Sequence, residues 1–146
     1  ADHTIFDHTI FALAGDGCFQ EGVSAESAAF AAHEKLDNLV ILYDANEVTL
    51  DKMAEYTQSE DILKRYEGYG WEVFDIDGHD LDAVQAAMSA AKTNKNGKPK
   101  FIKCNTIIGK GMPETEGTNA AHGEAGVPYV DKAREGLGLP ADKWHV

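Results

Sequence analysis

The sequence predicts an α/β fold, namely a mostly parallel, doubly wound sheet with helices on both faces. Short apolar runs rich in β-forming residues recur along the chain, a helix-like segment lies between most of them, and turn residues follow them. Strands connected in this way form βαβ units, whose strands run parallel. The length of 146 residues is that of one domain. Since no shift in composition marks a boundary, we expect residues 1–146 to form a single domain.

The chain begins with a strand and a helix. Thr9–Ala14 is an apolar run, and Gly15-Asp16-Gly17 breaks it. Glu21–Leu36 is predicted to be helical because alanines recur at three- and four-residue steps. Leu39–Tyr43 is a second apolar strand, and Asp44-Ala45-Asn46 ends it with residues that favour turns.

A second helix, a third strand and a third helix follow. Ser59–Tyr69 is typical of a helix, with Ser59 as its N-cap. Trp71–Ile76 alternates in polarity as a strand does, and Asp77-Gly78 is a turn. Asp80–Lys92 is the most clearly amphipathic helix of the chain. Its apolar face consists of Leu81, Val84, Ala87, Met88 and Ala91.

Lys100–Cys104 is the last predicted strand, and Val127–Leu137 is the last predicted helix. We expect a sheet of about four strands that lie in the order in which they occur in the chain. Ligands of such sheets bind at the carboxyl ends of the strands. Three segments follow strands and are therefore candidates for a site: Gly15-Asp16-Gly17, Asp44-Ala45-Asn46 and the chain from Ile108 onward.

Composition excludes several classes of function. The formal net charge of −12 argues against nucleic acids and anionic membrane surfaces, because such partners require a basic face. No apolar run approaches the ~20 residues of a membrane span. Cys18 and Cys104 are too few for a disulfide framework and lack the spacing of a zinc site. We expect both to be free thiols in a reducing, cytoplasmic environment.

Oxygen donors follow two neighbouring strands of the predicted sheet. Asp16 lies between glycines that permit a sharp turn and a close approach to a ligand, and its carboxylate suits Mg²⁺ or Ca²⁺. Asn46 follows the next strand, and the carbonyl of Val48 offers a third oxygen. Because adjacent parallel strands end close together, we expect these donors to reach one cation that anchors a diphosphate. Taken singly, each residue is also consistent with an ordinary turn.

Longer motifs surround these donors: GDGCFQEG at 15–22, KLDNLVILYDANEVTLD at 35–51, RYEGYGWEV at 65–73, TIIGKG at 106–111 and AHG at 121–123. Together they resemble the transketolase family of thiamine-diphosphate enzymes, over essentially the whole chain from Ile10. The E1 components of 2-oxo-acid dehydrogenases share the GDG and the strand that follows. Cys18, Glu21, the TIIGKG run and the AHG histidine are more similar to transketolase.

The resemblance implies thiamine diphosphate and Mg²⁺ (or Ca²⁺) as cofactors. It implies metal binding by Asp16, Asn46 and the carbonyl of Val48. It implies that His122 contacts the diphosphate near the reaction centre and acts as a catalytic residue that helps to transfer a proton. The residues that it places against the cofactor are Gly15, Asp16, Gly17, Cys18, Glu21, Asn46, Leu50, Ile108 and His122.

The implied activity is the transfer of a two-carbon ketol unit from a ketose phosphate to an aldose phosphate. A transketolase subunit is several times longer than this chain, so we expect a partial domain, the C-terminal part of the diphosphate-binding domain. We expect the pyrimidine-binding domain, which is normally contributed by the partner subunit of a homodimer, to lie outside these 146 residues. We therefore expect the isolated chain to be inactive, with an empty cofactor site and a segment Ile108–Gly126 that is poorly ordered or displaced. We expect the apolar area left by the missing domains to be exposed or covered by another copy of the chain, and the helix from Glu21 is the candidate dimer interface.

Two alternatives remain from the sequence. The chain is also consistent with a non-catalytic assembly module whose ligand binds only with a partner chain. It is consistent, further, with a fragment of an E1-type 2-oxo-acid dehydrogenase.

Overall fold

The computed structural model describes residues 7–142, apart from the side chain of Ala125. In this range the chain forms two compact units. The first contains the described residues up to Ala45 together with Ser59–Thr106, and the second contains Asn46–Gln58 and the described residues from Ile107 onward. No helix among these described residues is long and apolar enough to cross a membrane.

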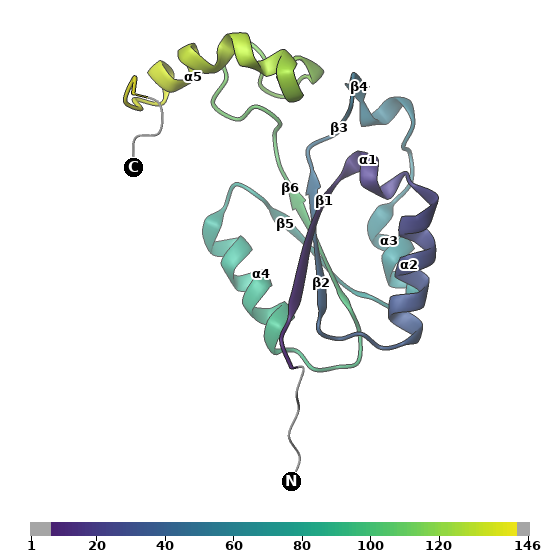
Figure 1. The fold of residues 1–146 in the computed structure, drawn as a ribbon. Helices are drawn as coiled ribbons and strands as arrows, with labels where there is room; N and C mark the ends of the chain where they lie inside the picture. The colour runs from purple at the N-terminus through teal and green to yellow at the C-terminus, as the bar shows by residue number, and fades with distance from the viewer. Residues whose placement is uncertain (1–6, 143–146) are drawn as a thin grey trace. The chain divides into compact units, whose positions relative to one another are not determined.

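The first unit is built on a four-stranded parallel sheet, which confirms the predicted fold class (Figure 1). Each strand ends slightly further along the chain than the sequence predicts. The strands are β1 (Ile10–Gly15), β2 (Leu39–Ala45), β5 (Glu72–Asp77) and β6 (Lys100–Asn105).

The strands lie in the order β1-β2-β6-β5, so the predicted chain order is wrong. β6 is the last strand in the chain but lies between β2 and β5. Central strands are covered on both faces, and β2 and β6 supply the apolar side chains that are completely buried there: Val40, Phe101 and Ile102, each 0% exposed. β5 contains exposed residues and suits an edge position.

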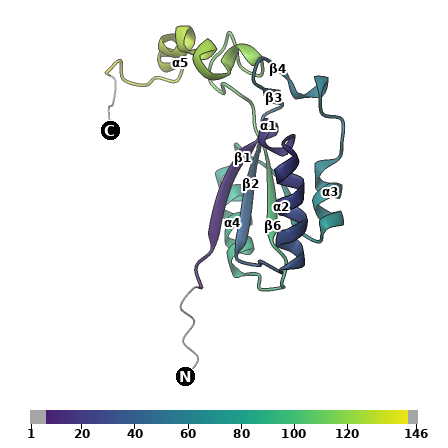
Figure 2. The same cartoon turned by 45° about the vertical axis from the view of Figure 1, so that its right-hand side comes forward.

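Helices cover both faces of this sheet, as expected for a doubly wound fold (Figures 1 and 2). α2 (Gly22–His33) and α3 (Ile62–Tyr69) pack on one face, and α4 (Leu81–Thr93) packs on the other. A short helix, α1 (Asp16–Phe19), precedes α2, whereas the sequence predicts only a turn there.

Aspartates begin α3 and α4. The N-cap of α3 is Asp61, whose carboxylate accepts a hydrogen bond from the backbone N–H of Lys64 at 3.2 Å. The predicted Ser59 cap is therefore wrong, because Asp61 adjoins the first helical residue and its side chain reaches the unpaired N–H groups. Asp80 caps α4 by accepting from two backbone N–H groups at 3.0 and 3.1 Å.

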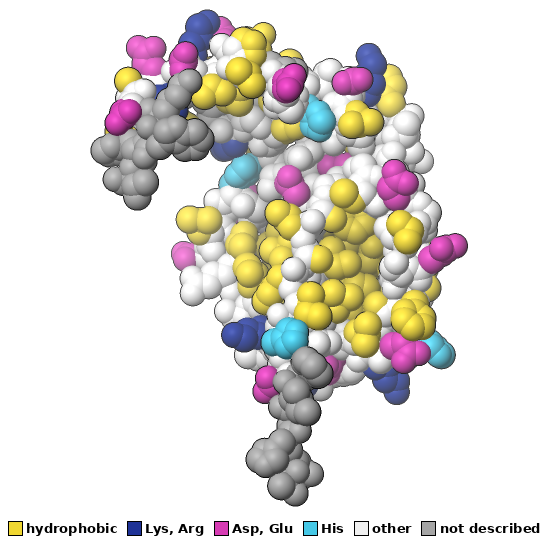
Figure 3. Space-filling view, viewed as in Figure 1, with side chains coloured by type: hydrophobic (Ala, Val, Ile, Leu, Met, Phe, Trp, Pro, Cys, Tyr) yellow, Lys and Arg dark blue, Asp and Glu magenta, His cyan; other side chains and the backbone are white. Residues whose placement is uncertain are grey.

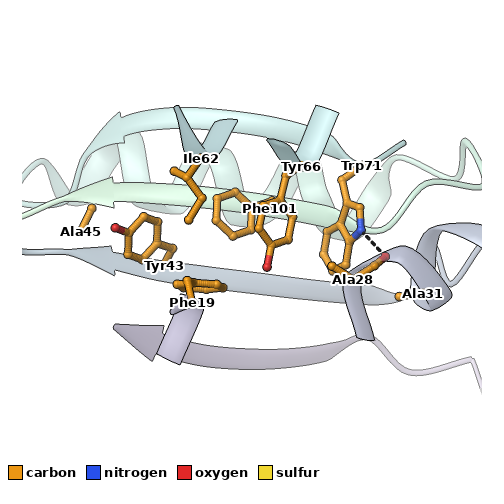
Figure 4. Close-up of a cluster of buried hydrophobic side chains, with 9 residues drawn as sticks. All are labelled: Phe19, Ala28, Ala31, Tyr43, Ala45, Ile62, Tyr66, Trp71 and Phe101. Carbon is orange, nitrogen blue, oxygen red and sulfur yellow. Dashed lines mark hydrogen bonds between the residues drawn. The ribbon is translucent and has the colours of Figure 1, made fainter. Parts of the chain in front are cut away.

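The larger hydrophobic core lies between the sheet and the helices α1, α2 and α3 (Figure 4). The ring of Tyr66 stacks on that of Phe101, with centroids 3.8 Å apart. Trp71 is buried beside them and donates its indole N–H to the carbonyl of Ala28 at 2.9 Å. Burial raises the pKa of Tyr66 to about 12, because the phenolate would lose its hydration.

A second core cluster holds α4 against the other face of the sheet. Ala87 and Ala91 are buried as predicted, and Val84 and Met88 are half-buried. Leu81 is 80% exposed, so the predicted apolar face begins one turn later. The helix packs on residues of the central strands, namely Val40, Ile102 and Cys104.

The edge strand β1 exposes much of its apolar surface. Ile10 is 47% exposed, Phe11 41% and Leu13 79%. Figure 3 shows hydrophobic side chains gathered over the part of the first unit that β1 crosses. The expectation of exposed apolar area is therefore confirmed. Although Thr9–Ala14 is apolar in sequence, several of its side chains are not buried within this chain.

The second unit has short elements. Its strands β3 (Val48–Thr49) and β4 (Lys52–Met53) form an antiparallel hairpin that the sequence does not predict. Its helices are η1 (Ala54–Tyr56), η2 (Asn119–Ala121), η3 (Gly123–Tyr129) and α5 (Val130–Gly136).

The predicted helix Val127–Leu137 is only partly correct. Pro128 lies within η3, which is a 3₁₀-helix, and the α-helix begins only at Val130. The first three residues of the predicted helix therefore belong to η3 and not to the α-helix. Where the sequence predicts a poorly ordered segment, Ile108–Gly126, the structure describes successive turns and 3₁₀-helices closed by backbone hydrogen bonds.

Candidate functional site

The carboxyl ends of β1, β2 and β6 lie at the same edge of the sheet. The strand register pairs Gly15 of β1 with Asp44 of β2, and Asp44 with Cys104 of β6. The prediction that the strands preceding Asp16 and Asn46 are neighbours is therefore confirmed. In α/β sheets this edge is where ligands bind.

Asp16 is a buried carboxylate at this edge. It begins α1 and is 4% exposed. The hydroxyl of Tyr43 donates a hydrogen bond to Asp16 Oδ1 at 2.6 Å. Because a buried carboxylate loses its hydration, a bond from a hydroxyl stabilises it and fixes its orientation. The first unit thus presents one oriented, hard oxygen donor of the kind that Mg²⁺ and Ca²⁺ prefer.

The other predicted cofactor residues of the first unit surround Asp16 in sequence. A Cβ built on Gly15 would lie 4.0 Å from the carbonyl of Asp44, and one on Gly17 would meet no heavy atom within 4 Å. Packing within the chain therefore does not require either glycine, and open space lies beside Gly17. Cys18 is exposed, and Glu21 is the exposed N-cap residue of α2.

Three more of the predicted residues lie in or just before the β3–β4 hairpin, since Asn46 precedes β3 by two residues. The side-chain oxygen of Asn46 accepts a hydrogen bond from the backbone N–H of Val48 at 3.1 Å, so two predicted metal ligands are held together. Val48 itself is 4% exposed. Leu50 lies in the turn with φ 42°, in the left-handed region that apolar residues rarely adopt, and is 76% exposed.

The TIIGKG and AHG motifs meet within the second unit. Gly109 has φ +65°, and a Cβ on it would lie 2.6 Å from the Cβ of Ala121. Only glycine permits this approach, which explains why a glycine stands there. His122, the residue after Ala121, is half-buried, and its backbone N–H donates to the carbonyl of Asn119 at 3.1 Å.

Two further hydrogen bonds hold this loop. The side-chain amide of Asn119 donates to the carbonyl of Asp51 at 2.7 Å, which ties η2 to the hairpin turn that carries Leu50. The carbonyl of Ile108 accepts from the backbone N–H of Gly117 at 2.9 Å. The hairpin and the His122 loop therefore form one connected group within the second unit.

The predicted metal ligands are divided between the units, with Asp16 in the first and Asn46 and Val48 in the second. Among residues 7–142, no three His, Cys, Asp or Glu side chains gather as a metal site. The predicted ligand set contains only one such side chain, and its other donors are an amide and a carbonyl.

Sequence reasoning misses several residues that support these positions. Tyr43 is counted among the apolar strand residues, although its hydroxyl holds Asp16. Thr106 directly follows β6 and Asn119 begins η2, and their hydrogen bonds to Asp44 and Asp51 join distant parts of the chain. Only the motifs around these residues could have pointed to their supporting role. The register of parallel strands, which decides their hydrogen-bond partners, cannot be predicted from composition.

Both cysteines of the chain are free, as predicted. Cys104 is buried in the sheet, and burial, assisted by the negative charge of Asp44, raises the pKa of its thiol. Cys104 is therefore a packing residue and not a nucleophile. Cys18 is the exposed thiol, next to the site residues of α1.

Comparisons with known proteins agree with this geometry. The family model described as "Transketolase, thiamine diphosphate binding domain" matches residues 1–146. A transketolase of Physarum polycephalum is 53% identical over 146 residues, which cover 99% of this chain and 22% of that protein.

Solved transketolase structures are also similar to this chain. The transketolase of Campylobacter jejuni superposes with a TM-score of 0.89 at 35% identity, over 97% of this chain and 22% of that one. A Pichia stipitis transketolase in complex with sedoheptulose 7-phosphate gives a TM-score of 0.86 at 32% identity, over 94% of this chain and 21% of that one. This chain thus spans about a fifth of the length of these proteins. It belongs to the transketolase family and corresponds to part of the family's thiamine diphosphate-binding domain.

Proposed function

We propose that this chain supplies the metal- and diphosphate-binding part of a transketolase. The reaction is the transfer of a two-carbon ketol unit from a ketose phosphate to an aldose phosphate. The observation that carries the proposal is the whole-chain match to the thiamine diphosphate-binding domain, combined with a buried, oriented carboxylate, Asp16, at the ligand-binding edge of the sheet. The sedoheptulose 7-phosphate bound by the Pichia stipitis relative supports sugar phosphates as substrates.

The proposed metal ligands are Asp16, Asn46 and the carbonyl of Val48. One carboxylate, one amide and one carbonyl suit Mg²⁺ or Ca²⁺, which take oxygen donors and complete their shell with water and phosphate. The side-chain oxygen of Asn46 is an amide oxygen, which is a donor type that both cations accept. The donor chemistry of these residues therefore fits the metal.

The proposed diphosphate and thiazolium contacts are made by Gly15, Gly17 and Cys18. The open space beside Gly17 supports this role, since an added Cβ there would meet no atom of the chain. Leu50, which is largely exposed in a left-handed turn, and Ile108 would supply apolar contacts. Exposed apolar side chains in constrained turns are more typical of ligand contacts than of packing. Glu21 is proposed for the cofactor network at the start of α2.

Thiamine diphosphate, when bound, supplies the carbon nucleophile that permits cleavage beside the ketose carbonyl. The residues of this chain fix the metal–diphosphate end of the cofactor. His122 would contact the diphosphate through its imidazole and hold or move a proton near the reacting atoms. Its position beside the Gly109–Ala121 contact limits the freedom of its backbone.

The remaining partners are proposed from the membership of this chain in the transketolase family. A pyrimidine-binding domain, normally of the partner subunit, would complete the cofactor site, and the assembly would be a cytoplasmic homodimer. The isolated chain should then lack ketol transfer, because the residues that activate the cofactor lie in that domain.

The test has two arms. In the first, residues 1–146 replace the matching segment of the Physarum polycephalum transketolase, and ketol transfer and cofactor affinity are measured. We expect an active chimera whose affinity for thiamine diphosphate depends on Mg²⁺. In the second, the 146-residue chain is heated with and without Mg²⁺ and thiamine diphosphate, and ligand binding should raise the melting temperature.

An inactive but folded chimera that also fails to bind the cofactor would contradict the proposal. Such a result, with no thermal shift for the isolated chain, would favour a non-catalytic assembly module. A chimera that decarboxylates 2-oxo acids and does not transfer ketol units would favour an E1-type enzyme.

A further inference from the structure

A polar contact joins the ends of the two central strands of the first unit. The hydroxyl of Thr106, the residue after β6, donates to Asp44 Oδ1 near the end of β2. The backbone N–H of Thr106 donates to the carbonyl of Ala45 at 3.2 Å. Thr106 is thus bonded to β2 through both its side chain and its main chain, and we call these contacts the 44–106 clamp.

The clamp is held from the other side by Gly78, in the turn after β5. A Cβ on Gly78 would lie 2.5 Å from Thr106 Cγ2 and 3.1 Å from the carbonyl oxygen of Asn105. The backbone N–H of Gly78 also donates to that carbonyl at 2.8 Å. Thr106 is therefore confined between β2 and the Gly78 turn, and its hydroxyl has little freedom to leave Asp44.

The clamp lies where the chain leaves the first unit. Ala45 is followed by Asn46, and Thr106 is followed by Ile107, which are the residues at which the second unit begins. Asn46 and Ile108 are both proposed to contact the metal or the cofactor. The starting points of these two segments are thus fixed to each other by residues of the first unit.

We propose that Asp44 and Thr106 are positioning residues for cofactor binding: they hold together the strand ends from which the segments carrying Asn46 and Ile108 depart. This inference rests on the proposed function of those segments. Neither residue needs to touch the metal or the cofactor. The negative charge of Asp44 strengthens the bond from the threonine hydroxyl, as expected for an ionised acceptor.

The first experiment measures amide hydrogen exchange in the 146-residue chain without ligand. Thr106→Val keeps the shape of the side chain and removes the hydroxyl. We expect exchange over residues 45–48 and 106–109 to become at least about tenfold faster, because one hydrogen bond to a charged group is lost. Thr106→Ser keeps the hydroxyl and should restore slow exchange. The control is Thr93→Val, which removes a threonine hydroxyl bonded to the carbonyl of Ser89 at 2.9 Å in α4.

The second experiment measures the dissociation constant for thiamine diphosphate with Mg²⁺ in the chimera. Thr106→Val and Asp44→Ala should each weaken binding about tenfold, and their effects should not add in the double variant, since each removes one partner of the same hydrogen bond. Thr106→Ser and Thr93→Val should bind as the parent does. Equal exchange and equal affinity in Thr106→Val and Thr93→Val would overturn the inference.

The variant Asp16→Asn distinguishes a failure of this inference from a failure of the proposed function. If Asp16→Asn leaves Mg²⁺-dependent binding unchanged, the proposed metal site is wrong, whatever the clamp variants do. If Asp16→Asn removes binding while the clamp variants retain it, the metal site stands and the positioning role of Asp44 and Thr106 is wrong.

Discussion

The hydroxyl of Tyr43 lies 2.6 Å from Asp16 Oδ1 and joins the strand β2 to the first residue of α1. Both residues are buried, at 3% and 4% exposure. The carboxylate that we propose as the only charged metal ligand is therefore oriented by the strand next to its own. A substitution at position 16 changes this hydrogen bond as well as the charge, and the two effects have to be separated.

Asp16→Asn should weaken Mg²⁺-dependent binding of thiamine diphosphate by on the order of a hundredfold, because it removes the charged donor and keeps an oxygen for Tyr43. Asp16→Ala should also lose binding but should cost about 1–3 kcal/mol of stability, since it leaves a buried hydroxyl without this acceptor. Tyr43→Phe is the matched control, because it removes the same hydrogen bond and keeps the carboxylate. Calorimetric titration of the chimera, with denaturant unfolding of each variant, measures both quantities. Equal affinity in the parent and Asp16→Asn would contradict the assignment.

Asn46→Ala should weaken Mg²⁺-dependent binding of thiamine diphosphate about tenfold, which is a smaller loss than that expected for Asp16→Asn. The reason is that an amide oxygen brings no net charge to the cation. The side chain of Asn46 also accepts from Val48 N–H at 3.1 Å, so its loss should loosen the start of the hairpin. Asn46→Asp provides the comparison, since it keeps the acceptor and adds a charge. The same titration checks the order of the affinities, and an Asn46→Ala defect larger than that of Asp16→Asn would reverse the proposed roles.

The sequence predicts the strands and the main helices because apolar runs and helical periodicity are local signals. The place of β6 between β2 and β5 is not local, since it depends on which strands are buried on both faces. The β3–β4 hairpin is also missed, because Leu50 occupies a left-handed turn position that favours glycine or asparagine. Motif resemblance names the proposed site residues, but it does not identify Tyr43 or Thr106, whose hydrogen bonds depend on strand register.

Gly109→Ala should disturb the His122 loop more than Gly138→Ala does. Both glycines have positive φ, +65° and +66°, so both substitutions carry similar backbone strain. Only at Gly109 would the new Cβ meet a neighbour, the Cβ of Ala121 at 2.6 Å, whereas nothing lies within 4 Å at Gly138. We expect an extra cost of about 1–3 kcal/mol at Gly109. Hydrogen exchange at the His122 amide should accelerate in Gly109→Ala alone, and equal exchange in both variants would show that the contact is unimportant.

Phe30→Lys should weaken self-association of the chimera if α2 is the dimer interface. Phe30 is 63% exposed and Val23 66% exposed on this helix, whose buried residues are both alanines. A lysine at the centre of an apolar interface leaves a buried charge without a partner. Leu81→Lys, at a residue that is 80% exposed on α4, is the matched control. Sedimentation velocity measures the dimer fraction, and equal dissociation of the two variants would place the interface elsewhere.

Tyr66→Phe should change the response of stability to alkaline pH. Burial raises the pKa of Tyr66 from 10.0 to about 12 in the folded chain. Below pH 10 the phenol is protonated in both the folded and the unfolded state, so its contribution to stability is fully present. Between pH 10 and pH 12 the unfolded chain releases the proton and the folded chain retains it, so rising pH favours unfolding. By pH 12 the parent should have lost about 2–3 kcal/mol relative to Tyr66→Phe.

Denaturant unfolding at several pH values from 9 to 12 measures this difference on the 146-residue chain. The lysines and the other tyrosines are common to both proteins, so their titration cancels in the comparison. Tyr56→Phe, at a tyrosine that is 71% exposed, controls for the loss of a hydroxyl outside the core. If the curves for the parent and Tyr66→Phe stay parallel up to pH 12, the stacking of Tyr66 on Phe101 does not exclude water well enough to raise the pKa of the phenol.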